Sequence, residues 1–215
     1  MPEPTAAPMR LAVFASGGGS NFGAMLAAID AGRLDAAPVL LVADRPGTGA
    51  AEKAEARAVP VAVLPPADFD GEAAFADRLL DALGHSGATH VALAGYLKKV
   101  PARVVAAYRH RMLNVHPALL PAFGGKGYYG QRVHEAVIAH GCRVSGATVH
   151  LVDAEYDTGP IVLQEPVPVL PDDTPRARAA RVLQVEHRIY PEALQLFAAG
   201  RVRVEGRRVF IEDGG

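Results

Sequence analysis

The first half of the chain alternates short apolar runs with segments in which apolar residues recur at helical spacing. The short runs predict five strands, at residues 10–15, 38–43, 61–64, 91–94 and 112–115. The intervening segments predict four helices, at residues 22–31, 48–58, 70–83 and 101–108. Strands that alternate with helices at this pitch form βαβ units, so the pattern predicts a mostly parallel sheet.

The second half has a different pattern, which begins with an irregular stretch rich in Pro, Gly and Tyr. Its expected elements are that stretch at 117–130, a helix at 132–140, strands at 144–152 and 161–169, a helix at about 174–197 and a hairpin at 201–211. Thr174 is suited to cap the long helix. The whole pattern predicts an α/β, Rossmann-like, mostly parallel sheet with helices on both faces, to which the C-terminal half adds an antiparallel portion.

Length and composition are those of a one-domain globular protein. The chain has 215 residues, of which 50% are hydrophobic, enough for a full core. Residues 1–9 are expected to form a disordered lead, and residues 10–215 a single domain. Lys and Arg number 22 against 23 Asp and Glu, and the net charge of −1 argues against a dedicated nucleic-acid binder.

Other features of the composition point to the reducing cytosol. Cys142 is the single cysteine, so the sequence has neither a disulfide framework nor a thiolate metal cluster. No apolar run approaches the roughly 18 residues of a membrane span, and the N-terminal residues lack the features of a signal peptide. We therefore expect a cytoplasmic protein without membrane or nucleic-acid partners. Arg176, Arg178 and Arg181 are accordingly interpreted as a solvated face of the long helix rather than an RNA-binding patch.

A glycine-rich turn, residues 16–21 (SGGGSN), joins the first predicted strand to the first helix. Backbone N–H groups and the positive end of a helix bind anions at such a turn, and Ser20 and Asn21 add side-chain donors. Phe22 replaces the last glycine of a dinucleotide-binding motif and no Gly-Lys-Ser/Thr follows, so a single phosphate is the favoured ligand. A tight turn that only caps the helix is the alternative. Asp44, at the end of the second strand, is a weak sign of a dinucleotide site.

The segment 112–117 (MLNVHP) carries the most informative side chains. Because side chains alternate along a strand, Asn114 and His116 point to the same side, at the carboxyl end where open α/β sheets build their sites. The Asn114 amide could donate to a developing oxyanion, and His116 could carry a proton near neutral pH. The alternative is a buried polar pair satisfied by loop backbone. His150 alternates into a later strand and could face the same site.

Asp157 lies in the turn between the two C-terminal strands. A carboxylate beside His116 would favour the imidazolium and raise its pKa. The alternative is an Asx-type turn residue, since the sequence alone does not place Asp157 next to His116.

Several motifs together resemble the glycinamide ribonucleotide formyltransferase family, folate-dependent enzymes of purine synthesis, from about residue 10 to residue 197. They are the SGGGSN turn, AGYL at 94–97, LNVHPALLP at 113–121, GATVH at 146–150, DTGPI at 157–161 and EHRIYP at 186–191. The run Asn-x-His-Pro-x-Leu-Leu-Pro, followed by Asp-x-Gly-Pro, is highly specific for the formyltransferase superfamily. The glycine turn and Glu-His-x-x-Tyr-Pro narrow the resemblance further.

The resemblance implies a role for each matching residue. Asn114 and His116 match the catalytic pair, and Asp157 the aspartate that raises the pKa of the histidine. The implied substrate-binding residues are Gly18, Gly19, Ser20 and Asn21 for the ribonucleotide phosphate, Pro117, and Glu186 near the glycinamide amine. The folate would be bordered by Leu93, Leu97, Lys98, Lys99, Val100, Val105, Asn114, Val152 and Asp153. Residues 10–110 would then be the phosphate-binding half and residues 111–200 the catalytic and folate-binding half, with no metal.

Two departures from the family pattern concern the folate. Lys98 and Lys99 stand where an arginine and an apolar residue are usual. Residues 70–73 (DGEA) stand where many members carry an arginine for the glutamate tail of folate. We therefore assign no residue to the contact with the glutamate tail. Lys98 or Lys99 is a hypothetical source of the positive charge that would bind it.

The implied reaction transfers a formyl group from the co-substrate 10-formyltetrahydrofolate to the amine of glycinamide ribonucleotide. Asn114 and His116 would stabilise the tetrahedral intermediate. The expected partners are these two small molecules, and the protein is expected to be a monomer or a homodimer. The alternatives are a formyltetrahydrofolate deformylase, which is a hydrolase with similar catalytic residues, and a non-catalytic nucleotide-binding module that uses only the glycine turn.

Overall fold

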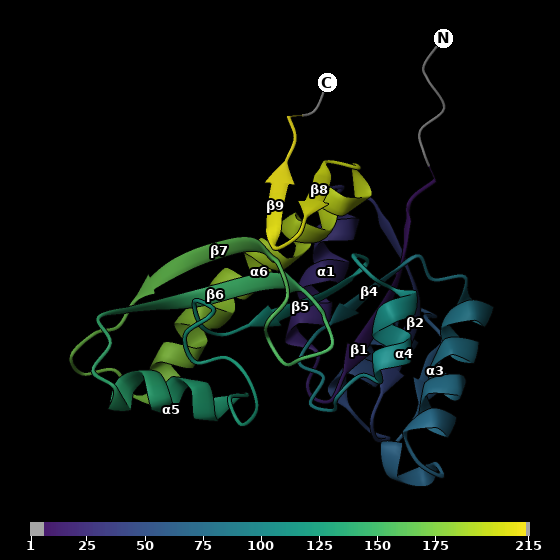
Figure 1. The fold of residues 1–215 in the computed structure, drawn as a ribbon, viewed down its shortest axis with the longest axis horizontal. Helices are drawn as coiled ribbons and strands as arrows, with labels where there is room; N and C mark the ends of the chain where they lie inside the picture. Colours follow the sequence, from purple (N-terminus) through teal and green to yellow (C-terminus); the bar gives the residue numbers. More distant parts are fainter. Residues whose placement is uncertain (1–6, 214–215) are drawn as a thin grey trace.

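The computed structural model describes residues 7–213 (Figure 1). Its elements, in chain order, are β1 (Met9–Ala15), α1 (Ser20–Asp30), β2 (Ala36–Ala43), α2 (Gly49–Glu55), β3 (Val61–Val63), a short 3-10 helix (Pro66–Asp68), α3 (Glu72–Ser86), β4 (His90–Leu93), α4 (Ala102–Ala107), β5 (Met112–His116), α5 (Gln131–Ala139), β6 (Val144–Leu151), β7 (Ile161–Pro168), α6 (Pro175–Ala198), β8 (Val202–Glu205) and β9 (Arg208–Ile211). Residues 1–6 of the expected lead lie outside the described residues, and β1 already begins at Met9. None of the described helices is long and apolar enough to cross a membrane.

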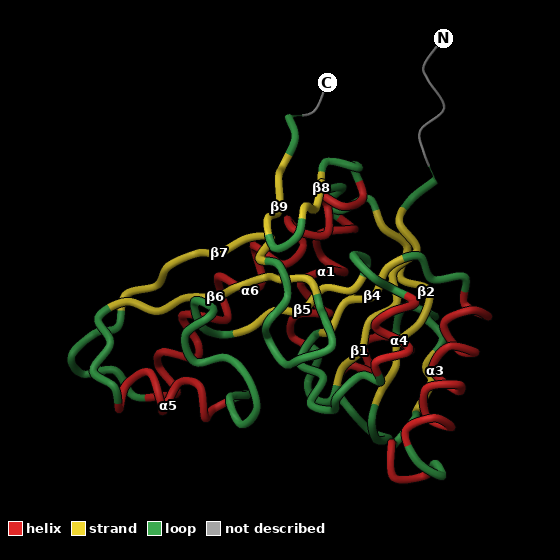
Figure 2. The backbone as a smooth tube through the Cα atoms, viewed as in Figure 1, coloured by secondary structure: helices red, strands yellow, loops and turns green. Residues whose placement is uncertain are grey.

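Seven strands form one sheet in the order β3-β2-β1-β4-β5-β6-β7 (Figure 2). The strands from β3 to β5 in this order pair in parallel, whereas β6 runs antiparallel to both β5 and β7. The predicted mostly parallel sheet with an antiparallel C-terminal portion is therefore confirmed. β8 and β9 form the separate hairpin that the sequence predicted.

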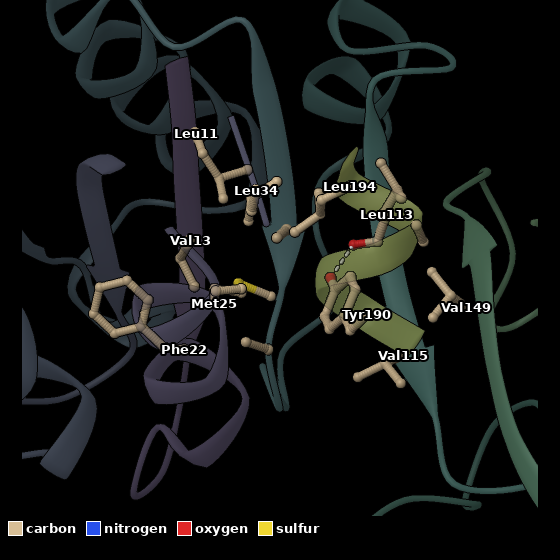
Figure 3. Close-up of a cluster of buried hydrophobic side chains, with 14 of the residues drawn as sticks. Leu11, Val13, Phe22, Met25, Leu34, Leu113, Val115, Val149, Tyr190 and Leu194 are labelled. Carbon is tan, nitrogen blue, oxygen red and sulfur yellow. Dashed lines mark hydrogen bonds between the residues drawn. The ribbon is translucent and has the colours of Figure 1, made fainter. Parts of the chain in front are cut away.

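Helices cover both faces of the sheet, because its parallel strands are apolar on both sides. In β1, Leu11 and Val13 belong to one hydrophobic cluster, and Ala12 and Phe14 to the other. The first cluster packs against α1, α2 and α6, and the second against α3 and α4. Figure 3 shows the first cluster, where side chains from α1, β5 and α6 meet.

Helix ends differ from the sequence predictions by a few residues, and local caps explain the differences. Thr48 precedes α2 and caps it, because its hydroxyl accepts a backbone N–H of the first turn. Gly71, at φ 91°, precedes α3, and Gly87 ends this helix in the left-handed conformation. Thr174 caps α6 as predicted.

The strand order brings several loops together at the carboxyl ends of the parallel strands. The neighbours β1 and β4 lead to helices on opposite faces, and ligands bind at such a point in open α/β sheets. β5 ends beside β4, and the antiparallel β6 places His150 opposite Asn114. The loops that leave β1, β4 and β5 therefore adjoin one another.

Tyr190 ties α6 to the strands that end at this edge. Its side chain is fully buried, and its hydroxyl lies 2.9 Å from the Leu113 carbonyl of β5 (Figure 3). The same hydroxyl lies 3.2 Å from the Leu93 carbonyl of β4. The single hydroxyl hydrogen is shared between these two oxygens, so one side chain fixes α6 against both strands.

Tyr190→Phe should lower the free energy of unfolding by about 1 kcal/mol, because it removes a buried hydrogen bond while keeping the ring. Urea unfolding followed by circular dichroism measures the change. Tyr129→Phe removes the hydroxyl of a ring that is 47% exposed and should leave the midpoint where it is. A Tyr190→Phe midpoint equal to that of the wild type would contradict this role of the hydroxyl.

Candidate functional site

A cavity of about 610 Å³ opens where β4 and β5 end. Its size is typical of small-molecule sites. The loops after β4, between β5 and α5, and between β6 and β7 line it together with α6. The residues predicted from the sequence that line it are Asn21, Leu93, Leu97, Lys98, Lys99, Val100, Asn114, His116, Pro117, Val152, Asp153, Asp157 and Glu186. Within the described chain, those that do not line it are Gly18, Gly19, Ser20 and Val105.

Asp157 joins the predicted catalytic pair through its carboxylate. Its Oδ2 accepts the Gly125 backbone N–H at 2.9 Å and lies 3.5 Å from His116 Nδ1. Its Oδ1 lies 3.5 Å from Asn114 Nδ2 and 3.6 Å from His150 Nε2. Asp157 itself adopts φ 57°, a left-handed conformation that aspartate tolerates better than most non-glycine residues. The structure thus places beside His116 an aspartate that the sequence alone could not place.

His150 completes this group, and the strand alternation of β6 was its only signal in the sequence. Its Nε2 lies 3.1 Å from Asn114 Nδ2, and its Nδ1 lies 2.8 Å from the Leu151 carbonyl. A carbonyl can only accept, so Nδ1 carries a ring proton, and Nε2 faces both the Asn114 amide and the Asp157 carboxylate. The Asn114 amide nitrogen in turn lies 3.1 Å from His150 and, at a longer distance of 3.5 Å, near Asp157.

His116 is 4% exposed, and its two ring nitrogens face different partners. Nε2 donates to the Phe123 carbonyl at 2.8 Å, and Nδ1 faces Asp157. Burial has the largest effect on the pKa of His116 and lowers it. Asp157 and the Phe123 carbonyl raise this pKa, and His150 and Arg178 lower it by smaller amounts. Asp157 therefore acts on the pKa of His116 in the predicted direction, but burial has the larger effect and the net shift is downward. The depth of burial thus decides whether the pKa of His116 rises or falls.

The carboxyl group of Asp157 stays ionised beside these rings. Burial raises its pKa, but the His150 contact, the His116 ring and the Gly125 N–H together lower it further, so the net shift is downward. Asp157 is therefore a lasting negative charge in the wall of the cavity.

The glycine turn has the strand-to-helix geometry that the sequence predicted. Gly19 adopts φ 66°, and a Cβ there would lie 2.7 Å from the Cα of Ala50 in α2, so packing alone already requires this glycine. Within the described chain, α1 has no side-chain cap and no acidic residue in its first turn. Its first N–H groups and its positive end can therefore receive an anion.

Lys53 of α2 is a functional candidate that the sequence reasoning missed. Its Nζ donates to the Gly18 carbonyl at 2.8 Å and lies 3.4 Å from the Gly49 carbonyl. An ammonium group is thus held against the glycine turn by backbone oxygens. No motif marks Lys53, because 35 residues separate it from Gly18.

Asn21 and Glu186 connect the glycine turn with α6. Asn21 Nδ2 donates to Glu186 Oε2 at 2.8 Å. Burial raises the pKa of Glu186, and the Asn21 N–H and Arg178 lower it by less. The sequence interpretation directed the Asn21 amide at a phosphate, whereas the structure directs its N–H at Glu186. The Asn21 Oδ1 is buried without a hydrogen-bond partner among residues 7–213.

The segment after β4 carries the two lysines that depart from the family pattern. Lys98 Nζ lies 3.9 Å from the buried carboxylate of Asp44, and Lys99 Nζ lies 5.8 Å from the centre of the Tyr156 ring. Both lysines line the cavity, as expected. Val105 of α4 is instead buried in the second hydrophobic cluster and does not line the cavity, which corrects its expected place beside the folate.

Arg178 contradicts the interpretation of three arginines as a solvated helix face. Its side chain is fully buried, whereas Arg176 is exposed and Arg181 pairs with Asp173 at 2.8 Å. The sequence pattern favoured exposure because arginine is rarely buried without a partner. As for metals, no group of three or more His, Cys, Asp or Glu side chains in the described part of the chain is arranged to hold one.

Comparisons with known proteins agree with one another. The chain matches the family model described as formyl transferase over residues 9–194, a range that includes every predicted site residue. It is 45% identical over 195 residues to the chloroplastic phosphoribosylglycinamide formyltransferase of Arabidopsis thaliana, over 90% of this chain and 67% of that protein. It is 36% identical to the phosphoribosylglycinamide formyltransferase of Bacillus subtilis, over 86% of this chain and 93% of that protein. The crystal structure of glycinamide ribonucleotide transformylase 1 from Symbiobacterium toebii superimposes with a TM-score of 0.91 at 40% identity, over 97% of this chain and 96% of that one.

The buried histidines of the cavity should make the protein less stable in weak acid. Burial, with Arg178 and His116, lowers the pKa of His134 from 6.5 to about 4, and the pKa of His116 also lies below its ordinary value. Between pH 6.5 and about pH 4, His134 binds a proton in the unfolded chain but not in the folded protein. The free energy of unfolding therefore falls as the pH falls through this range. Urea unfolding at about pH 7, 6 and 5 measures the slope, which His134→Gln should flatten. Equal stability across this range would contradict neutral, buried rings.

Proposed function

The chain belongs to the formyl transferase family and is an enzyme of purine biosynthesis, and from this premise we propose that its cavity is the place of formyl transfer. The formyl group would pass from 10-formyltetrahydrofolate to the amine of glycinamide ribonucleotide. The observation that carries the proposal is the Asp157 carboxylate in the cavity wall, at 3.5 Å from Asn114 and His116 and 3.6 Å from His150.

Formyl transfer needs hydrogen-bond donors for an oxygen that becomes negative. Attack of the ribonucleotide amine on the formyl carbon forms a tetrahedral intermediate whose oxygen carries the charge. Asn114 and protonated His116 are the proposed donors, with one amide hydrogen of Asn114 turning from its 3.5 Å contact with Asp157 to the oxygen. Losing one such donor typically raises the barrier by about 2.7–4 kcal/mol. That both side chains line the same cavity supports this assignment.

The lowered pKa of His116 is compatible with a role as an acid. A negative oxygen beside the imidazole raises its pKa, and Asp157 at 3.5 Å from Nδ1 acts in the same direction. The Nε2–H must exchange the Phe123 carbonyl for the substrate. His116 can then give its proton to the leaving folate nitrogen and take up the proton that the attacking amine loses, each directly or through water, so that the ring ends protonated again.

The proposed reaction uses no metal and no covalent intermediate with the enzyme. The attacking group is the amine of the substrate, so the half-buried Cys142 is not required. The cytosol is the proposed compartment, and this rests on the cysteine usage of the sequence. A monomer or a homodimer is the proposed assembly.

The glycine turn and the start of α1 are proposed to hold the phosphate of the ribonucleotide. Residues 18–20 offer backbone N–H groups at the positive end of the helix. Lys53 adds a cation on the same turn, through its contact with the Gly18 carbonyl. Asn21 and Glu186 line the cavity and are bonded to each other, which supports one continuous site from the phosphate to the reacting amine.

The folate is proposed to lie between segment 97–100 and loop 152–157. Both segments line the cavity, and so does the buried apolar side chain of Leu93. The two lysines of the first segment are the proposed partners of the glutamate tail. This assignment rests on their charge and on their place in the cavity lining.

Asp157→Asn should reduce turnover by roughly 100-fold or more while the protein stays folded, because the substitution keeps the shape and removes the charge beside His116. Absorbance of the folate product at saturating ribonucleotide measures turnover, and urea unfolding checks the fold. Asp172→Asn, at an exposed position, is the matched control. Turnover near that of the wild type would sink the assignment of Asp157.

Lys53→Met should raise the KM for the ribonucleotide roughly tenfold, with the KM for folate within about twofold, because a charge beside the phosphate is lost. Ser20→Ala should shift the two KM values in the same unequal way. Steady-state kinetics with each substrate varied separately gives both values. Arg57→Met removes the same charge from an arginine that pairs with Asp30, and it should change neither. Equal effects of Lys53→Met on both substrates would argue against a phosphate site at the turn.

A further inference from the structure

Arg178 is a fully buried cation without a carboxylate partner. It lies in the first turn of α6, and its side chain is inaccessible to solvent. Within residues 7–213 no acidic side chain forms an ion pair with it, and the nearby Asp173 pairs with Arg181 instead. Burying such a charge is costly unless its N–H groups find other acceptors.

Neutral acceptors from three other parts of the fold pair with the two terminal nitrogens of the guanidinium, whereas its Nε is buried without a hydrogen-bond partner among the described residues. Nη2 donates to the Pro117 carbonyl at 3.1 Å and also to the hydroxyl of Ser145 in β6. Nη1 donates to Nδ1 of His134 in α5. Pro117 directly follows His116, so one guanidinium joins α5, α6 and β6 to the strand end that carries the proposed acid.

The contact with Arg178 determines which nitrogen of His134 carries the proton. A guanidinium only donates, so Nδ1 is an acceptor and the ring proton lies on Nε2. Nε2 of His134 has no hydrogen-bond partner among the described residues. The buried polar atoms that lack a partner do not include it, so this nitrogen is not buried. It therefore faces accessible space, and the space that His134 lines is the cavity.

We propose that Arg178 is a positioning residue that keeps His134 neutral and presents its Nε2–H to the cavity as a hydrogen-bond donor for substrate recognition. The acceptor would be an oxygen of the ribonucleotide, so the inference rests on the proposed function of the cavity. The ribonucleotide is the favoured partner because Arg178 shares α6 with Glu186, which is bonded to Asn21 beside the glycine turn.

The two histidines would then serve different purposes, because their charged neighbours are opposite. His116 faces a carboxylate, which favours the imidazolium, and His134 faces a guanidinium, which disfavours it. Burial first and Arg178 second lower the pKa of His134 to about 4, and His116 acts in the same direction. The charged and titratable groups that act on the guanidinium itself are Asp173, Cys142, Arg181 and Glu186. One ring is suited to carry a proton, and the other to remain a neutral donor.

Nitrogen-15 magnetic resonance of the histidine rings tests the positioning role without reference to turnover. In the wild type, His134 should carry its proton on Nε2 and stay neutral down to about pH 5. In Arg178→Met, the ring should show both tautomers and titrate nearer to its ordinary pKa. Arg181→Met removes a charge one turn away and should leave the His134 signals unchanged.

Two results would overturn the positioning role. One is a wild-type His134 with its proton on Nδ1, and the other is an unchanged His134 spectrum in Arg178→Met. If Arg178→Met does not fold, the wild-type spectrum still decides, because an Nδ1–H is incompatible with the guanidinium contact.

Kinetics of His134 variants test the donor role. His134→Phe should raise the KM for the ribonucleotide about 3- to 10-fold with little change in the KM for folate, and His134→Gln, which keeps an N–H, should recover most of this loss. Equal losses in both variants, or no loss in either, would overturn it. If the enzyme formed folate product without the ribonucleotide, the proposed function would be contradicted. The tautomer measurement on His134 would still test the role of Arg178, because it does not depend on turnover.

Discussion

The half-buried carboxylate of Asp157 organises the cavity. Asp157 lies in the turn between β6 and β7, and this turn folds back so that the carboxylate reaches the Gly125 N–H and the side chains of Asn114 and His116. The arrangement costs a buried charge and a left-handed aspartate, which the surrounding donors offset. It also depends on the antiparallel pairing of β5 with β6, because this pairing sets His150 opposite Asn114. The chemistry of the site therefore depends on the pairing of these two strands.

The long helix α6 supports the cavity from the other side. Tyr190 fixes it to the carbonyls of β4 and β5, Glu186 bonds Asn21 at the glycine turn, and Arg178 bonds the carbonyl that follows His116. These contacts lie along one helix, so a shift of α6 would disturb the proposed phosphate site and the catalytic strand together. Under our proposals, a carboxylate and a guanidinium act on different histidines, which gives two rings in one cavity different protonation behaviour.

Local periodicity was enough to predict most of the fold, because strands and helices that bury one or two faces show it directly in the sequence. It also placed Asn114 and His116 on one side of a strand. It could not bring Asp157 to Asn114 across 43 residues, or Asn21 to Glu186 across 165, because such contacts depend on chain topology. The buried Arg178 was misinterpreted for a related reason, since its acceptors are neutral atoms of other elements. The effect of Asp157 on the pKa of His116 was predicted in the right direction, but the larger, opposite effect of burial could not be read from the sequence.

The central claim is that the cavity transfers a formyl group to the amine of a ribonucleotide rather than to water. The most direct measurement is the absorbance change on formation of the folate product, recorded with and without glycinamide ribonucleotide. Product should form only when the ribonucleotide is present, in proportion to the amine consumed. Product formed at the same rate without it would contradict the claim and would identify the reaction as hydrolysis.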